Sequence, residues 1–240
     1  MRKLKTVIRY ECATSFKYIW CFYAIEYLFV IFISLIIAIS TGSMEDVGTN
    51  CLEVNSLIYS GVLGVLGFKE DFKMLIQNGF TRKYIFLATA ALFVFIAGIM
   101  SFVDAVTGNV LHHILNDYSS LYGGLYGYDS ILSNWIWLFL VYMVICVLMY
   151  LGILVINKIG KNLSLLVGIL VGGLILVGIA IVRFVLPEEV VYDLLNVLQR
   201  AFGFMENGTI NYLYPSLTLL LIVGILGLGS YAVIRRTELV

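Results

Sequence analysis

Long apolar runs, separated by short polar segments, set the pattern of this 240-residue chain. A helix that crosses the hydrocarbon core of a bilayer needs about 20 mostly apolar residues. Six runs come near that length, although the second is short and begins at or before Glu53. The predicted spans are Ile19–Ser40, Leu52–Phe68, Tyr84–Val106, Leu132–Ile156, Leu163–Phe184 and Leu213–Ile234. The pattern therefore predicts an all-α membrane protein with six transmembrane helices in one domain over residues 1–240.

Two segments outside these spans have helical periodicity of their own. In residues 1–18 the apolar stripe predicts a helix in the inner membrane interface; a charged tail that only sets orientation is the alternative. That stripe holds Leu4, Ile8, Cys12 and Phe16. Between the fifth and sixth spans, Pro187 and the two glutamates after it suit a helix start. Apolar residues then recur every three or four positions towards the glycines at 203 and 208, which predicts an amphipathic outer helix.

The segment Phe68–Phe86 joins the second and third spans and is rich in charge of both signs. One helical stripe in it holds Phe68, Phe72, Leu75, Ile76 and Gly79. Gly79 is suited to end a helix, and Thr81 is suited to cap the next one. We therefore expect a short helix on the cytoplasmic membrane surface, hinged at Gly79. An orientation signal would need only cations, so the mixed charge favours a docking surface, although a solvated surface helix has the same pattern.

Composition agrees with lipid as the main solvent of the chain. Hydrophobic residues make up 61% and charged residues 12%, and the mean hydropathy is +1.00. A soluble domain of this size could not cover so much apolar surface. The net charge is zero, which gives no indication of a nucleic-acid partner. All 15 lysines and arginines except Arg183 and Arg200 lie at the termini or in the loops after the second and fourth spans, which predicts that both termini are cytoplasmic.

Glu26 is the one acid that the pattern places clearly within a span, about 10 Å past the start of the first. A charged group there costs at least about 2.5 kcal/mol, so it should face water or the bundle interior. Tyr23 and Tyr27 flank Glu26, and together they predict a substrate cavity; a hydrogen-bonded packing role is the alternative. Asp104 and Arg183 lie near the outer ends of their spans and are expected to pair.

Glycines at helical spacing mark two of the spans. Gly168 and Gly172 lie four residues apart in the fifth span, and three more glycines, at 61, 64 and 67, lie in the second. Small residues let helix backbones approach closely in lipid. In the fifth span they predict either packing within the chain or a dimer seam next to the first span.

Metal and nucleotide sites are not indicated. The four cysteines lack metal-ligand spacing, and the adjacent His112 and His113 have no third ligand nearby, so we expect no metal and assign the histidines no role. A phosphate-binding loop reads G-x-x-x-x-G-K-[ST]. The chain's one Gly-Lys pair, Gly160-Lys161, is followed by Asn162. No catalytic residue is predicted, and ATP would have to be handled by another chain.

The arrangement resembles the permease subunits of bacterial type-2 ABC exporters. The resemblance rests on the sequence "NGFTRKYIF" after the second span, with Gly-x-Thr-Arg-Lys at Gly79–Lys83, and on the order of spans and flanking helices over the whole chain. It implies a multi-pass permease in the cytoplasmic membrane, with no cofactor of its own. It also implies a coupling helix that docks on a separate ATPase subunit, which binds ATP and Mg²⁺. The residues implied in docking are Glu70, Asp71, Phe72, Lys73, Gly79, Thr81 and Arg82.

The same resemblance implies further partners. They are a second copy of the permease or a sister chain, membrane lipid, and an amphipathic or hydrophobic substrate. That substrate would be a peptide such as a bacteriocin or a phenol-soluble modulin, or a drug or lipid.

Two other classes of protein fit the sequence less well than an exporter permease does. An ion-coupled secondary transporter would need several buried acids or broken helices, and the sequence places one deep acid. An intramembrane enzyme would need two cooperating polar groups at membrane depth. Glu188 and Glu189 resemble the paired glutamates of intramembrane prenyl-type proteases, but position 192 is Tyr instead of the expected arginine and the pair lies outside the spans.

Overall fold

The computed structural model describes residues 2–42, 50–69, 75–115, 118–205 and 207–235, and these ranges are helical apart from turns and one isolated bridge. The helices are α1 (Arg2–Thr41), α2 (Glu53–Lys69), α4 (Arg82–Ile114), α5 (Leu121–Tyr126), α6 (Ile131–Ile159), α7 (Lys161–Phe184), α8 (Glu188–Ala201) and α9 (Leu213–Arg235). Five of them, α1, α4, α6, α7 and α9, are long and apolar enough to cross a membrane. The all-α class is confirmed, and a multi-pass membrane protein is compatible with it.

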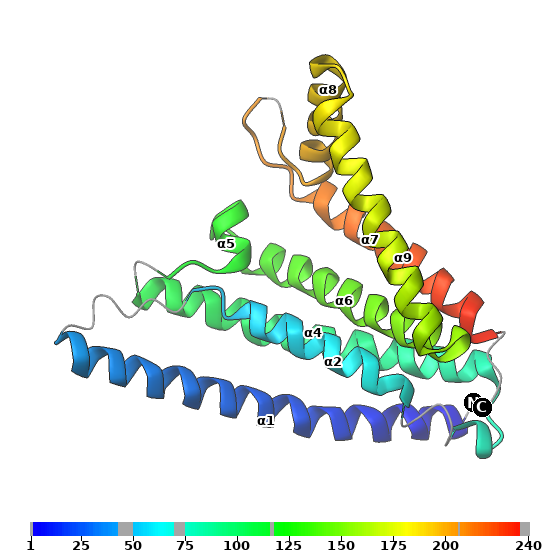
Figure 1. The fold of residues 1–240 in the computed structure, drawn as a ribbon. Coiled ribbons are helices and arrows are strands. Elements are labelled where there is room, and N and C mark those ends of the chain that lie inside the picture. Colours follow the sequence, from blue (N-terminus) through cyan, green and yellow to red (C-terminus); the bar gives the residue numbers. More distant parts are fainter. Residues whose placement is uncertain (1, 43–49, 70–74, 116–117, 206, 236–240) are drawn as a thin grey trace.

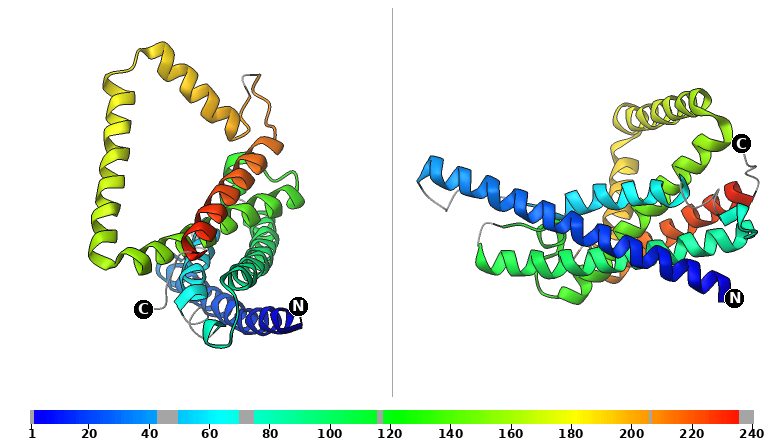
Figure 2. Two further views of the ribbon diagram at one scale, coloured as in Figure 1. Left: turned by 90° about the vertical axis from the view of Figure 1, so that its right-hand side faces the viewer. Right: turned by 90° about the horizontal axis from the view of Figure 1, so that it is seen from below.

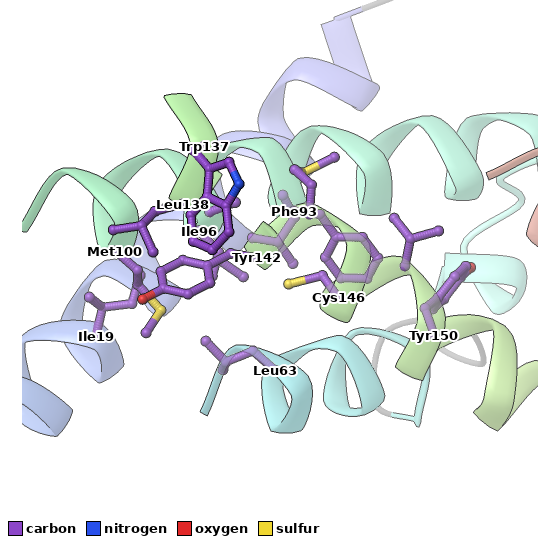
Figure 3. Close-up of a cluster of buried hydrophobic side chains, with 14 of the residues drawn as sticks. Ile19, Leu63, Phe93, Ile96, Met100, Trp137, Leu138, Tyr142, Cys146 and Tyr150 are labelled. Carbon is purple, nitrogen blue, oxygen red and sulfur yellow. The ribbon is translucent and has the colours of Figure 1, made fainter. Parts of the chain in front are cut away.

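Helix α6 is the centre of the bundle. It packs against α2, α4 and α9, while α1 lies along α4 (Figure 1). The core between them is rich in aromatic and sulfur-containing side chains, and Phe93, Tyr142 and Cys146 lie together in it (Figure 3). Such large side chains maximise van der Waals contact, which holds helices together where lipid supplies no hydrophobic drive between them.

Helix α1 is one unbroken helix of 40 residues, so residues 2–18 are helical as expected but continue into the first predicted span without a break, and their position at a membrane interface stays a prediction. No glycine or proline interrupts this stretch, and a helix once formed extends at little cost. The predicted stripe contacts protein as well. Cys12 is half-buried against the core, and the ring of Phe16 lies 6.5 Å from that of Phe95 on α4.

Helix α2 is the short span that the sequence left uncertain. Its 17 residues reach about 25 Å at the helical rise, less than the hydrocarbon thickness of about 30 Å. A sixth span therefore stays a prediction. Two of its glycines have a packing role within the chain. A Cβ on Gly64 would lie 2.6 Å from the carbonyl oxygen of Cys146, and one on Gly61 would lie 3.3 Å from Ile145. Glycine therefore allows α2 to cross α6 closely.

We expect Gly64→Ala to push α2 away from α6, because the new methyl group would meet backbone that cannot rotate aside. Overpacking of this kind costs about 1–3 kcal/mol, which thermal unfolding in detergent, followed by circular dichroism, would register as a lower Tm. Gly98→Ala in α4 is the matched control, since a Cβ there meets nothing within 4 Å. Equal Tm values for the two variants would contradict the close crossing.

The segments between the third and fourth and between the fifth and sixth predicted spans contain helices. After Val106, α4 continues to Ile114. The short α5 follows, and it begins where the Ser120 hydroxyl accepts a hydrogen bond from the Gly123 amide at 2.9 Å. The expected helix after Pro187 is present as α8. Gly203, at φ +88°, ends it with the paired carbonyl contacts of a Schellman motif.

Helix α7 stands apart from the bundle (Figure 2). None of its residues is buried, and its packing contact within the described structure is with α6, next to it in sequence. A Cβ on Gly168 or Gly172 would meet nothing within 4 Å. Of the two roles predicted for these glycines, close packing within the described chain is therefore wrong, and the dimer seam stays a prediction.

Helix ends that carry lysine and arginine lie together at one end of the bundle. Helices α1, α4 and α7 begin there, and α2, α6 and α9 end there (Figure 1). The Arg82 guanidinium donates to the Arg235 carbonyl at 3.0 Å and so joins the start of α4 to the end of α9. Which side of a membrane this end faces stays a prediction.

Candidate functional site

Asp104 of α4 is bound by hydroxyl groups from three other helices. Tyr142 of α6 donates to its Oδ2 at 2.6 Å. Tyr23 of α1 and Ser56 of α2 donate to its Oδ1 at 3.0 and 3.2 Å. All four side chains are buried. One carboxyl group therefore ties α1, α2, α4 and α6 together.

The expected pairing of Asp104 with Arg183 is wrong. Arg183 lies on the outlying α7, where its guanidinium carbon is 5.5 Å from the centre of the Phe184 ring. The sequence placed Asp104 near the outer end of its span because that span was expected to end at Val106. Helix α4 continues to Ile114, which adds about two turns and moves Asp104 inward along the bundle.

Glu53, at the first turn of α2, is a second buried acid and is only 1% exposed. Its Oε2 accepts a long hydrogen bond of 3.4 Å from the Leu121 amide, whereas its Oε1 is buried without a partner among the described residues. A Cβ on Gly108 would lie 2.9 Å from that Oε1, so glycine at this point of α4 makes room for the carboxyl group. The sequence pattern indicates Glu53 only as the uncertain start of the second span.

Glu26 lines a cavity of about 410 Å³ between α1 and α2. It is 8% exposed, its Oε1 has no partner among the described residues, and Asn55 is within hydrogen-bonding reach. The rings of Phe22 and Tyr59 stack on each other at 4.2 Å in the wall of this cavity. The acid is therefore set in a largely apolar groove.

Tyr23 and Tyr27 do not share that groove. Tyr23 is buried against Asp104. Tyr27 lines a separate cavity of about 410 Å³ between α1 and α4, where its hydroxyl is 3.1 Å from that of Thr107. The rings of the two tyrosines stack at 5.7 Å. The three residues of the predicted substrate cavity thus lie close together but face different surroundings.

Glu26, Glu53 and Asp104, which we call the carboxylate cluster, interact electrostatically in neighbouring pairs. No lysine, arginine or histidine is buried within the described ranges. Buried carboxylates without a cation are costly unless a proton or another cation offsets the charge. No group of three or more His, Cys, Asp and Glu in the part of the chain that the structure describes is arranged to hold a metal ion. The carboxyl groups of the cluster can take up and release protons, and a proton is one cation that would offset their charge.

The predicted docking segment is described in part. Glu70, Asp71, Phe72 and Lys73 lie outside the described residues. Leu75 is buried in the core, and Gly79, at φ +78°, closes a Schellman motif in which the Gly79 and Phe80 amides donate to the carbonyls of Ile76 and Leu75. Thr81 has the extended backbone of an N-cap but makes no side-chain cap bond. Gly79, Thr81 and Arg82 therefore lie together where the chain enters α4.

Comparison of the chain with family models, with curated proteins and with solved structures finds no match. The class that the fold defines is an all-helical protein with five helices long and apolar enough to cross a membrane.

Proposed function

We propose that this chain is the membrane-spanning subunit of an exporter that moves an amphipathic or hydrophobic substrate with energy from a separate ATPase. The observation that carries the proposal is how the segment from Leu75 to Arg82 is attached. Leu75 is seated in the core, and Arg82 binds the last carbonyl of α9. A force applied at this segment would pass directly into α4, which carries Asp104.

A second permease, either another copy or a sister chain, fits the surroundings of α7. This helix buries no residue in the chain, and Gly168 and Gly172 leave its backbone open to close approach. Lipid could cover this apolar helix, but contact with lipid does not explain why two glycines lie four residues apart in it. We place the seam between the two permeases along α7.

A second candidate function, ion-coupled transport, is favoured by the carboxylate cluster. The sequence pattern places one deep acid and keeps this class as the alternative, whereas the structure buries Glu26, Glu53 and Asp104 near one another between α1, α2 and α4. Acids at such depth are typical of proton pathways in transporters. The hydroxyls of Tyr23, Ser56 and Tyr142 around Asp104 would suit proton exchange.

The energy source separates the two candidates. In proteoliposomes that hold the chain with its ATPase, we expect transport of a cationic amphipathic peptide to require ATP, to stop with vanadate and to survive a protonophore. Replacing Glu70 and Asp71 with lysine should uncouple ATP hydrolysis from transport yet leave membrane insertion intact, because both charges are expected in water. Transport driven by an imposed pH gradient without ATP would overturn the proposal and favour the ion-coupled transporter.

A further inference from the structure

A cavity of about 460 Å³ lies at the end of the bundle formed by α5 and the starts of α6 and α9. Its volume falls in the range of small-molecule sites, about 300–1,000 Å³. Four aromatic residues from three parts of the chain line it: Tyr122, Tyr126, Trp137 and Tyr212. The cavity is remote in sequence from the carboxylate cluster and plays no part in the proposed function.

The four rings form a continuous aromatic wall. The rings of Tyr122 and Tyr126 are 5.1 Å apart, and each lies within 6 Å of Trp137 at a steep angle of 59° or 67°. The ring of Tyr212 stands edge-on to Tyr126 at 6.3 Å. Tyr122 and Tyr126 are 3% exposed and form the base, whereas Tyr212 is 36% exposed and forms the rim.

The hydroxyls of this wall are engaged with the protein, which leaves the rings as its main contact surface. Tyr126 donates to the Phe202 carbonyl at 2.9 Å, and Tyr212 donates to the Tyr126 carbonyl at 3.4 Å. Tyr122 is hydrogen-bonded to Ser133. Burial, with Tyr212 and Asp129 nearby, raises the pKa of Tyr122 to about 12, so the phenol stays neutral.

The charge around the cavity indicates which class of ligand would bind there. Aromatic faces attract cations, and no lining residue is a lysine or arginine. Asp129 is exposed and near enough to Tyr122 to act on it electrostatically. We propose that this aromatic wall binds a substituted ammonium group, either as a free cation or as the head group of an amphiphile.

Tryptophan fluorescence tests the proposal on the full chain, purified in a maltoside detergent without ATP. Trp137 is one of three tryptophans, so replacing Trp20 and Trp135 with phenylalanine makes it the sole reporter. We expect choline to change its emission saturably. The neutral isostere 3,3-dimethylbutan-1-ol should bind about 10-fold more weakly, because it has the same shape without the charge.

Two variants in the same background test the role of the wall. Tyr212→Leu should weaken choline binding about 10-fold, whereas Tyr212→Phe should retain it. Ile136, at the edge of the cavity, is 41% exposed. Ile136→Lys should abolish binding by supplying the chain's own ammonium group, while Ile136→Met, which is uncharged, should not. If Tyr212→Leu fails to fold, the comparison of Ile136→Lys with Ile136→Met still tests the proposal.

The source of the ammonium group is settled by comparing choline with dodecyltrimethylammonium. Binding of both supports a site open to the free cation, and binding of the amphiphile alone supports a site for its head group. Equal saturable responses to choline and its neutral isostere would overturn the proposal, as would the absence of a saturable response to both choline and the amphiphile. ATP plays no part in the measurement, so its outcome is independent of the proposed transport function.

Discussion

Asp104→Ala will leave three buried hydroxyl groups without their shared acceptor and will lower the free energy of unfolding by about 3 kcal/mol. All three retain a weaker partner: the Tyr23 hydroxyl also lies 3.1 Å from the Met100 carbonyl, that of Tyr142 lies 3.3 Å from the Glu53 carbonyl, and that of Ser56 lies 3.4 Å from the Tyr23 hydroxyl. The loss of stability should therefore be smaller than it would be if all three hydroxyl groups had no hydrogen-bond acceptor left. Denaturant titration in detergent, followed by circular dichroism, would measure it.

Asp104→Asn is the matched variant, since it keeps the volume and one acceptor oxygen. We expect it to retain most of the stability and so to separate two roles of the residue. If the asparagine variant folds but no longer transports, the ability of Asp104 to carry a charge or proton is part of the function. An alanine variant as stable as the parent would show that the four helices do not depend on this carboxyl group.

Glu26→Gln should strongly reduce transport of a cationic peptide and leave a neutral peptide of similar size much less affected. Glu26 lines the groove between α1 and α2 and has one oxygen without a partner among the described residues. A carboxylate in a groove with apolar walls attracts cations more strongly than one in water, because the local dielectric is lower. Glutamine keeps the shape and removes the charge.

Transport assays in proteoliposomes with the two peptides side by side would measure this difference. Asp193→Asn is a useful control, because Asp193 is an exposed acid in another part of the chain. Equal transport of the cationic peptide by the Glu26→Gln variant and the parent would give Glu26 a packing role, and the ATPase-driven mechanism would be unaffected.

The features that the sequence predicted correctly are those that depend on local pattern. Long apolar runs predicted six spans, and five helices among the described residues have the length and apolar character to cross a membrane. Pro187 and Gly203 predicted the limits of α8 to within a few residues. Gly79 was predicted to end a helix and does so with a positive φ. Each of these depends on a backbone preference or a hydrophobic period that neighbouring residues reveal.

The features that the sequence missed depend on contacts between helices. Ser56 and Tyr142 are 48 and 38 residues from Asp104, so no local pattern indicates that they meet. Glu53 marked only the uncertain start of the second predicted span, because no local pattern indicates that the Leu121 amide and Gly108, far along the chain, lie beside its carboxyl group. Tyr122 and Tyr126 lie between the predicted spans, where no local pattern indicates that they are buried beside Trp137.

The bond between Asp104 and Tyr142 has a consequence for synthesis on the ribosome. The partner that binds Asp104 at 2.6 Å lies 38 residues later in the chain. At about 5–20 residues per second, the three earlier helices α1, α2 and α4 wait several seconds with an incompletely bound acid. During this interval water or another molecule has to shield Asp104. The arrival of α6 is thus the step that locks the earlier helices together.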